Sequence, residues 1–167
     1  MKGSVVSVDL KEIQIEVPEG FQLILGQSHF IKTVEDIFET LATSMPGIKF
    51  GVAFCEASGK ALVRFDGNDQ IATELAKSVA SKIGAGHAFV VILNGSFPLN
   101  VLNRIKDVEE VASVYCATAN SVSVIALDTA SGRAILGVAD GIRSKGVEAE
   151  SDKTDRHDFL RKIGYKR

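Results

Sequence analysis

The stretch FQLILGQSHFIKTVED, residues 21–36, changes its hydrophobic period part-way along. Phe21, Leu23 and Leu25 recur with a period of two, which predicts a strand with a buried face. After Gly26 the apolar residues follow the spacing of a helix that ends at Pro46-Gly47, namely Val34, Ile37, Phe38, Leu41 and Met45. In α/β proteins such a junction between strand and helix is a common place for chemistry.

The polar residues of this junction have two interpretations. If the helix begins near His29, its free N–H groups and positive dipole end point at Ser28 and His29, which makes an anion site. In the alternative, Ser28 caps the helix, His29 is a hydrogen-bonded surface group, and the charged side chains of the helix are solvated. The junction alone leaves both open.

Composition indicates a single globular domain, residues 1–167, that buries its core without disulfides or metals. Hydrophobic residues make up 46% and charged residues 24%, so the chain as a whole is not expected to be disordered. A net charge of −2 without a basic run gives no nucleic-acid footprint.

The sequence also predicts a cytoplasmic protein without membrane contact. Its N-terminus lacks the apolar core of a signal peptide, and no window of 18 residues is uninterruptedly apolar. Cys55 and Cys116 stand alone in apolar runs, which favours buried free thiols over a metal or redox role.

Strands and helices alternate along the chain. We predict strands at residues 5–10, 13–17, 21–26, 48–56, 61–65, 89–93, 113–118, 122–128 and 133–138. Later helices are expected from Asn68 or Asp69 to Gly84, after Pro98, and from Thr154 to Gly164, with a surface loop over 141–153. The continuous apolar run Phe89–Leu93 is typical of a central strand covered on both faces. We therefore expect an α/β fold, a three-layer αβα sandwich with a mixed β-sheet.

Two common nucleotide motifs are absent. Gly59-Lys60 is followed by Ala61, where a phosphate-binding loop needs a hydroxyl for magnesium. The segment from Gly84 to Phe89 lacks the third glycine of the dinucleotide motif and leads into a strand.

Several polar residues at element ends remain as candidates. His87 stands where a glycine pair enters the central strand, and it could be a base, a nucleophile or a structural histidine. Three residues before the second helix could share an anion with its N-terminus, or could simply form a turn and a cap: Arg64, Asp66 and Asn68.

Further candidates follow in the second half of the chain. Asn100 and Asn103 lie three residues apart on a short helix, and their amides could read the edge of a base. Thr118, Asn120 and Asp140 provide polar groups at strand ends, although each also fits an ordinary turn.

Together these stretches resemble the adenosine-specific kinase family, a former domain of unknown function in archaea and some bacteria. The resemblance covers nearly the whole chain, through residues 26–36, 49–59, 85–87, 98–103, 117–120, 137–141 and 163–166. Two departures affect loops: Ser121 replaces an expected proline, and the segment 142–145 lacks one. They leave the conformation of these loops open.

The resemblance implies an α/β sandwich, binding of adenosine or AMP, and assembly as a trimer or a dimer of trimers. It also implies phosphoryl transfer to or from the nucleoside, for which a phosphohistidine needs no phosphate-binding loop. Either His29 or His87 could carry the phosphate. The phosphoryl donor and any Mg²⁺ that accompanies it are not identified by the residues.

Under this hypothesis Ser28, His29 and the start of the helix hold the phosphate, Lys32 offsets its charge, and His87 is the base or phospho-acceptor. Asp66 or Asp140 orients the ribose. The remaining ligand contacts would come from Gln27, Arg64, Asn68, Asn100, Asn103, Thr118 and Asn120. A non-catalytic AMP or adenosine sensor and a hydrolase that uses His87 with a carboxylate are the alternative functions.

Overall fold

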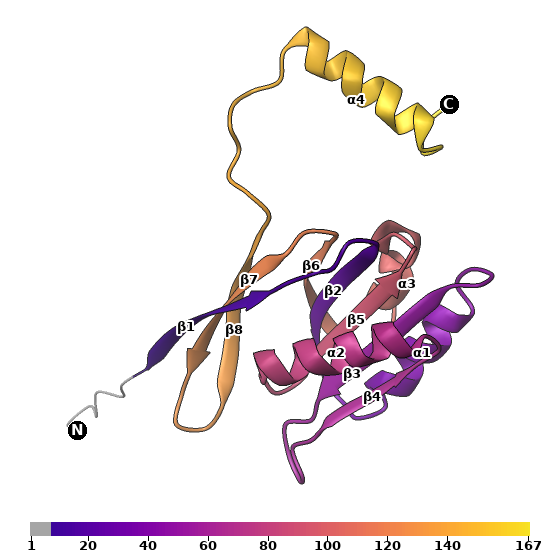
Figure 1. Ribbon diagram of the computed structural model, residues 1–167. Helices are drawn as coiled ribbons and strands as arrows, with labels where there is room; N and C mark the ends of the chain where they lie inside the picture. The colour runs from indigo at the N-terminus through magenta and orange to yellow at the C-terminus, as the bar shows by residue number, and fades with distance from the viewer. Residues whose placement is uncertain (1–7) are drawn as a thin grey trace.

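The computed structural model describes residues 8–167 and contains two antiparallel sheets and four α-helices (Figure 1). In chain order the elements are β1 (Asp9–Ile15), β2 (Phe21–Ser28), α1 (Thr33–Ala42), β3 (Lys49–Cys55), β4 (Val63–Gly67), α2 (Gln70–Ile83), β5 (Ala88–Asn94), the 3₁₀ turn η1 (Pro98–Asn100), α3 (Leu102–Lys106), β6 (Val111–Thr118), β7 (Val122–Asp128), β8 (Arg133–Asp140) and α4 (Glu150–Lys162).

The larger sheet has five strands in the order β4-β3-β5-β2-β6, and each neighbouring pair is antiparallel. The predicted mixed sheet is therefore wrong. β2 and β3 run in the same direction on either side of α1, but β5 lies between them and pairs with both. The alternation of strands and helices suggested that β2 and β3 would pair as parallel neighbours. Instead β5, which comes later in the chain, lies between them in the sheet.

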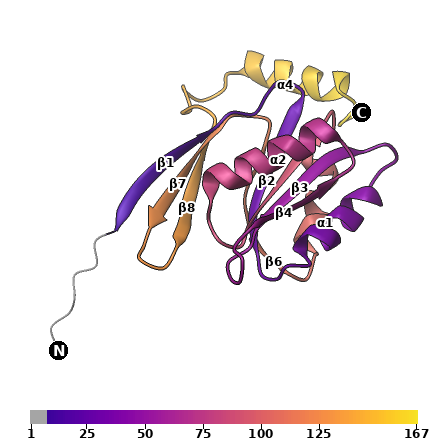
Figure 2. The same ribbon diagram turned by 60° about the horizontal axis from the view of Figure 1, so that its bottom comes forward.

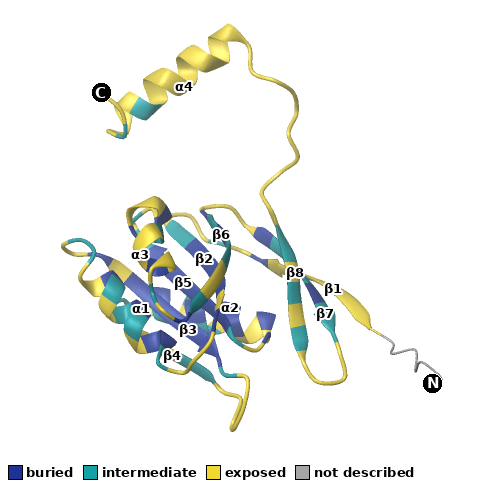
Figure 3. Cartoon of the chain, turned by 180° about the vertical axis from the view of Figure 1, so that it is seen from behind, coloured by how far each residue is buried: buried dark blue, intermediate teal, exposed yellow. Residues whose placement is uncertain are grey.

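Both faces of this sheet are covered. On one face lie α1 and α3 (Figure 3). They pack over buried side chains that include Phe50, Phe54 and Phe89. On the other face α2 packs over Ala53, Val90 and their neighbours. β5 is buried along its length apart from its last residue, as its continuous apolar run predicts.

The smaller sheet, β1-β7-β8, adds to the face that α2 covers (Figure 2). Its inward residues Ile15, Val122 and Val124 belong to the same buried cluster as α2. One face of the five-stranded sheet is thus covered by helix and sheet together, and the expected αβα sandwich of three layers is not confirmed.

Element boundaries correct three predictions. The expected strands 5–10 and 13–17 become one strand, β1; residues 5–7 of the first prediction lie outside the described residues. The two predicted hairpins are confirmed as β3–β4 and β7–β8. The last helix begins at Glu150 instead of Thr154, with Asp152 accepting a hydrogen bond from the backbone N–H of Ala149.

The first helix also starts later than predicted. α1 begins at Thr33, four residues after His29, and Lys32 at its N-cap makes no side-chain cap. Ser28 is therefore not the helix cap. By contrast, Asp69 caps α2 by accepting the N–H of Ala72 at 2.9 Å, and Gly84 ends α2 in a left-handed conformation, as the sequence indicates.

α4 stands apart from the rest of the molecule at the end of an extended segment (Figure 1). All its side chains are exposed or half-buried. Tyr165, just beyond it, donates its hydroxyl to Asn100 Oδ1 at 3.2 Å and packs edge-on to Phe97. Within residues 8–167 no helix has both the length and the apolar character needed to span a bilayer.

Candidate functional site

Backbone hydrogen bonds link four chain segments at one end of the five-stranded sheet. The N–H of His87 donates to Cys55 at 2.7 Å, and the N–H of Ser28 donates to the carbonyl of His87 at 3.0 Å. The N–H of His29 then donates to the carbonyl of Glu110 at 2.9 Å. Residues that are far apart in the sequence therefore meet at the same end of the sheet.

Two imidazoles lie at this end of the sheet. The rings of His29 and His87 meet edge to face with their centroids 5.0 Å apart. On its other side the His87 ring lies nearly parallel to that of Phe54, with centroids 6.0 Å apart and 13° between the planes. Because His29 is exposed and His87 half-buried, a ligand from solvent can reach this pair.

The backbone is strained next to His29 and at His87 itself. Phe30 has φ of 137° and His87 has φ of 65°, values that L-residues rarely adopt. Such outliers cost about 1–3 kcal/mol each and concentrate at functional sites. His87 is held in this conformation by hydrogen bonds from its N–H and to its carbonyl.

The buried side chains of Ser28 and Thr33 fix the segment between β2 and α1. Both side chains are buried, and the Thr33 hydroxyl lies 3.0 Å from the Ser28 hydroxyl and 2.5 Å from the carbonyl of Phe30. The buried Ser28 thus supports the loop that carries His29, instead of capping the helix.

Lys32 is held by two carboxylates. Its Nζ lies 2.5 Å from Asp36 Oδ2 and 3.0 Å from Glu110 Oε1. Asp36, and then Glu110, raise the pKa of Lys32, while the Lys32 ammonium lowers the pKa of Asp36. An ammonium has three N–H donors, so one remains for a ligand phosphate.

Glu110 is the buried member of this group, with a side chain 4% exposed. Lys32 is close enough for ion pairing, but neither Glu110 oxygen accepts a well-aligned hydrogen bond from the part of the chain that the structure describes. A buried carboxylate without such hydrogen bonds depends on the nearby ammonium to compensate its negative charge.

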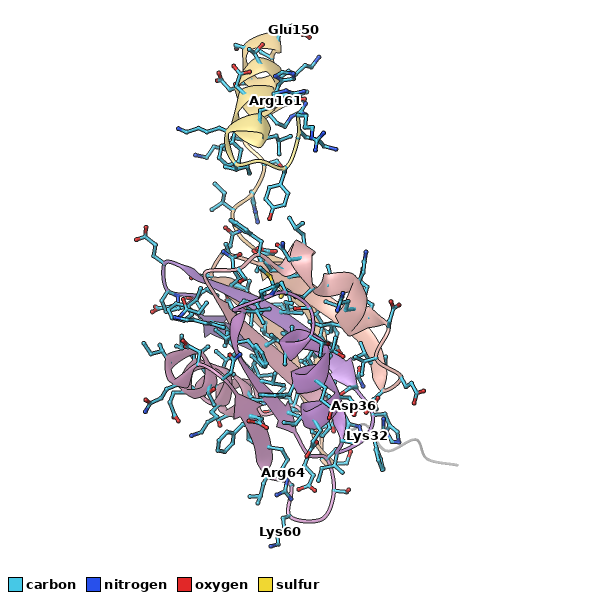
Figure 4. All side chains as sticks on the ribbon, turned by 90° about the vertical axis from the view of Figure 1, so that its right-hand side faces the viewer. Lys32, Asp36, Lys60, Arg64, Glu150 and Arg161 are labelled. Atoms are coloured by element: carbon cyan, nitrogen blue, oxygen red, sulfur yellow. The ribbon has the colours of Figure 1, made fainter. Side chains whose placement is uncertain are left out.

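Arg64 lies at the same end of the molecule as Lys32 and Asp36 (Figure 4). Its guanidinium binds Glu56 at 3.0 Å. Asp66 and Asn68 have local roles instead. Asp66 accepts the N–H of Gly67, and Asn68 uses both ends of its amide on the backbone of β3 and the residue before it.

The second-half candidates gather elsewhere. Asp140 Oδ1 accepts hydrogen bonds from Thr118 Oγ1 at 2.9 Å and from Asn120 Nδ2 at 3.0 Å. Thr118 pairs with Leu23, five residues before Ser28 on β2, which is about 17 Å at the usual rise of a strand. One chain therefore does not bring these three residues to the imidazoles.

Three other candidates are also distant from the pair or face away from it. Asn100 accepts from Tyr165 beyond α4, and Asn103 is exposed on α3. Gln27 accepts a hydrogen bond from the Tyr115 hydroxyl at 2.9 Å and lines a hollow with residues of β8.

Sequence reasoning missed Glu110, Phe54 and Thr33. Phe54 is one apolar residue in an apolar strand, and nothing in the sequence marks it as the neighbour of a histidine. Glu110 follows another glutamate before β6, a pattern that indicates a solvated turn. In residues 8–167 no three His, Cys, Asp or Glu side chains group closely enough to hold a metal ion.

Comparison with known proteins identifies the family. Residues 13–166 match the family model described as "Adenosine specific kinase". The chain belongs to the adenosine-specific kinase family. The resemblance inferred from the sequence motifs is therefore confirmed over almost the entire chain.

A solved structure of similar fold supports the architecture of this adenosine-specific kinase family member. The PH1918 protein from Pyrococcus horikoshii OT3 is 44% identical, with a TM-score of 0.92 over 96% of this chain and 99% of that one. No protein in a curated collection matches the chain.

Proposed function

We propose that this single-domain protein binds adenosine or AMP and transfers a phosphoryl group to or from it through a phosphohistidine. The observation that carries the proposal is the pair of imidazoles, His29 and His87, with ring centroids 5.0 Å apart. Lys32 follows His29 by three residues, and its ammonium lies 3.0 Å from Glu110, whose backbone carbonyl accepts the N–H of His29. Membership of the adenosine-specific kinase family supports the choice of substrate.

The transfer proceeds in two balanced steps. A neutral imidazole nitrogen attacks the terminal phosphorus of a nucleoside triphosphate; a P–N bond forms, the P–O bond breaks and the diphosphate leaves. The 5′-hydroxyl of adenosine then attacks the same phosphorus, so the P–N bond breaks and AMP forms. The second imidazole takes the hydroxyl proton, and Lys32 offsets the charge of the phosphoryl oxygens.

In the same proposal the subunits form trimers or dimers of trimers. The separation of Thr118, Asn120 and Asp140 from the imidazoles supports such an arrangement, because a neighbouring subunit could carry these groups toward a ligand. We also place the protein in the cytoplasm, since the two free buried thiols, Cys55 and Cys116, suit a reducing compartment.

Label transfer from γ-labelled ATP tests the kinase. The full chain should become labelled, with a bond stable to alkali and labile to acid, and should pass the label to adenosine as AMP. His29→Ala or His87→Ala should abolish AMP formation. His157→Ala is the matched control, because the third histidine of the chain lies on α4.

Two results would contradict this function. If AMP binds and no label moves, the protein is a nucleotide sensor and not a kinase. If adenosine is broken down without a donor, the hydrolase is correct. Calorimetry with AMP, run beside the label assay, separates these outcomes.

A further inference from the structure

A groove lies between the start of α1 and β4, and of the residues that line it only Arg64 has been given a role above. Its volume is about 470 Å³, within the usual range for small-molecule sites. Apolar residues and two charged ones line it, among them Ile31, Val34, Leu62, Glu35 and Arg64.

The rim of the groove exposes large apolar side chains. Ile31 is 44% exposed and Leu62 48%. Single exposed apolar residues are ordinary, but two that border one hollow form a surface suited to a flat, partly apolar ring.

The groove leads to the imidazole pair. Arg64 stands directly opposite Phe54 in the β3–β4 ladder, so the two side chains share a face of the sheet. Phe54 in turn lies against the ring of His87, and Ile31 follows His29 by two residues. A ligand that fills the groove can therefore extend to the imidazoles.

The charged residues of the groove differ in their availability. Arg64 is tied to Glu56, whereas the Glu35 carboxylate takes part in no hydrogen bond or ion pair within residues 8–167. Glu35 is exposed in the first turn of α1, where the helix dipole favours its negative charge. Its carboxylate is therefore free to meet a donor.

We propose that this groove binds the purine base and that Glu35 determines specificity by accepting a hydrogen bond from its exocyclic amino group. The inference rests on the proposed function. A carboxylate only accepts hydrogen bonds, so it favours the 6-amino group of adenine and disfavours the 6-oxo group of hypoxanthine. A hydrogen bond to a charged group accounts for a preference of about tenfold or more.

Calorimetry with adenosine and inosine tests this inference on the full chain. The unchanged protein should bind adenosine about tenfold more tightly than inosine. Glu35→Gln should bring the ratio near one, because an amide can both donate and accept. Leu62→Ala should weaken both nucleosides alike, since it removes apolar contact only.

Glu39→Gln is the matched control, being an exposed glutamate one turn further along α1 that lines a different hollow. It should keep the original ratio. Unfolding midpoints of all variants confirm that each is folded. If adenosine binds and Glu35→Gln keeps the original preference, the groove assignment is wrong while the proposed function stands.

Equal binding of both nucleosides to the unchanged protein would likewise overturn the role of Glu35. If the protein binds neither nucleoside and does not bind AMP, both proposals are overturned. If Asn120→Ala instead removed the preference for adenosine, the base would bind at the other end of the sheet.

Discussion

Glu110 shows at the scale of single residues how the candidate site is held together. Its carboxylate is buried beside the half-exposed ammonium of Lys32, which also binds Asp36. Removing the ammonium leaves a buried negative charge without compensation, which is costly, whereas removing both charges leaves no such penalty.

Lys32→Met should therefore lower the free energy of unfolding, and the exposure of Lys32 keeps this loss small. The double variant Lys32→Met with Glu110→Gln should recover part of that loss. Urea unfolding of both variants and of Glu110→Gln alone at pH 7 completes the cycle. A double variant less stable than Lys32→Met would show that Glu110 is stabilised by other groups.

Sequence patterns located the two histidines but could not relate them. The family resemblance implied that either one could carry a phosphate, and the fold places both rings together. The relation depends on two features without a local signal. Phe30 and His87 have positive φ although neither is glycine, and the start of β5 lies beside the end of β2 through long-range pairing of Ala88 with Gln27.

At the scale of elements, periodicity predicted most strands and helices but not their partners. The run Phe89–Leu93 correctly indicated a central strand. Its neighbours could not be read from it, because an apolar run is equally compatible with parallel and antiparallel pairing. Gly26 shows a hidden constraint of the same kind. A Cβ there would lie 2.3 Å from the Phe89 ring, so the pairing itself demands glycine.

Asp128 links the smaller sheet to α2. It binds Lys11 of β1 and Arg133 of β8, and Arg133 also donates to the carbonyl of Ile83 at 2.7 Å. Arg133, and then Lys11, hold the pKa of Asp128 well below its ordinary range. The stabilisation that Asp128 gives the folded state is therefore complete above the pKa that Asp128 has in the unfolded chain. It is lost as the pH falls through the lower pKa that Asp128 has in the folded protein.

Asp128→Asn should consequently be less stable than the unchanged protein at pH 7. The difference should shrink as the pH falls below about 4, the ordinary range of aspartate, and vanish in strong acid. Urea midpoints across this range measure it, with the exposed Asp107→Asn as control. A difference independent of pH would mean that Asp128 acts by packing and not by charge.

At the scale of the whole molecule, α4 is the exception to compact packing (Figure 3). Phe159 of α4 and Ile163, the residue after the helix, are 58% and 41% exposed, and a helix of 13 residues is marginal in water by itself. The sequence predicted a terminal helix, but composition could not show that it packs on so little of its own chain. The side-chain contacts of Tyr165 with Asn100 and Phe97 leave most of the surface of α4 exposed.

Deleting residues 143–167 should therefore leave the two sheets folded. We expect the melting temperature of the shortened chain to fall by less than about 4 °C, the shift of about 1 kcal/mol in a chain of this size. If α4 joins subunits in the proposed trimer, sedimentation should show a smaller assembly for the shortened chain than for the full chain. An assembly of unchanged subunit number would exclude this role.

The position of β5 between β2 and β3 also has a consequence for synthesis. When β2, α1 and β3 have emerged from the ribosome, neither strand has its central neighbour, and both present open hydrogen-bonding edges. The sheet closes only after residue 94 has emerged, and β6 completes it later. The nascent chain must therefore carry its strand-to-helix junction unpaired for some sixty residues of translation, a period in which chaperones have their main opportunity to act.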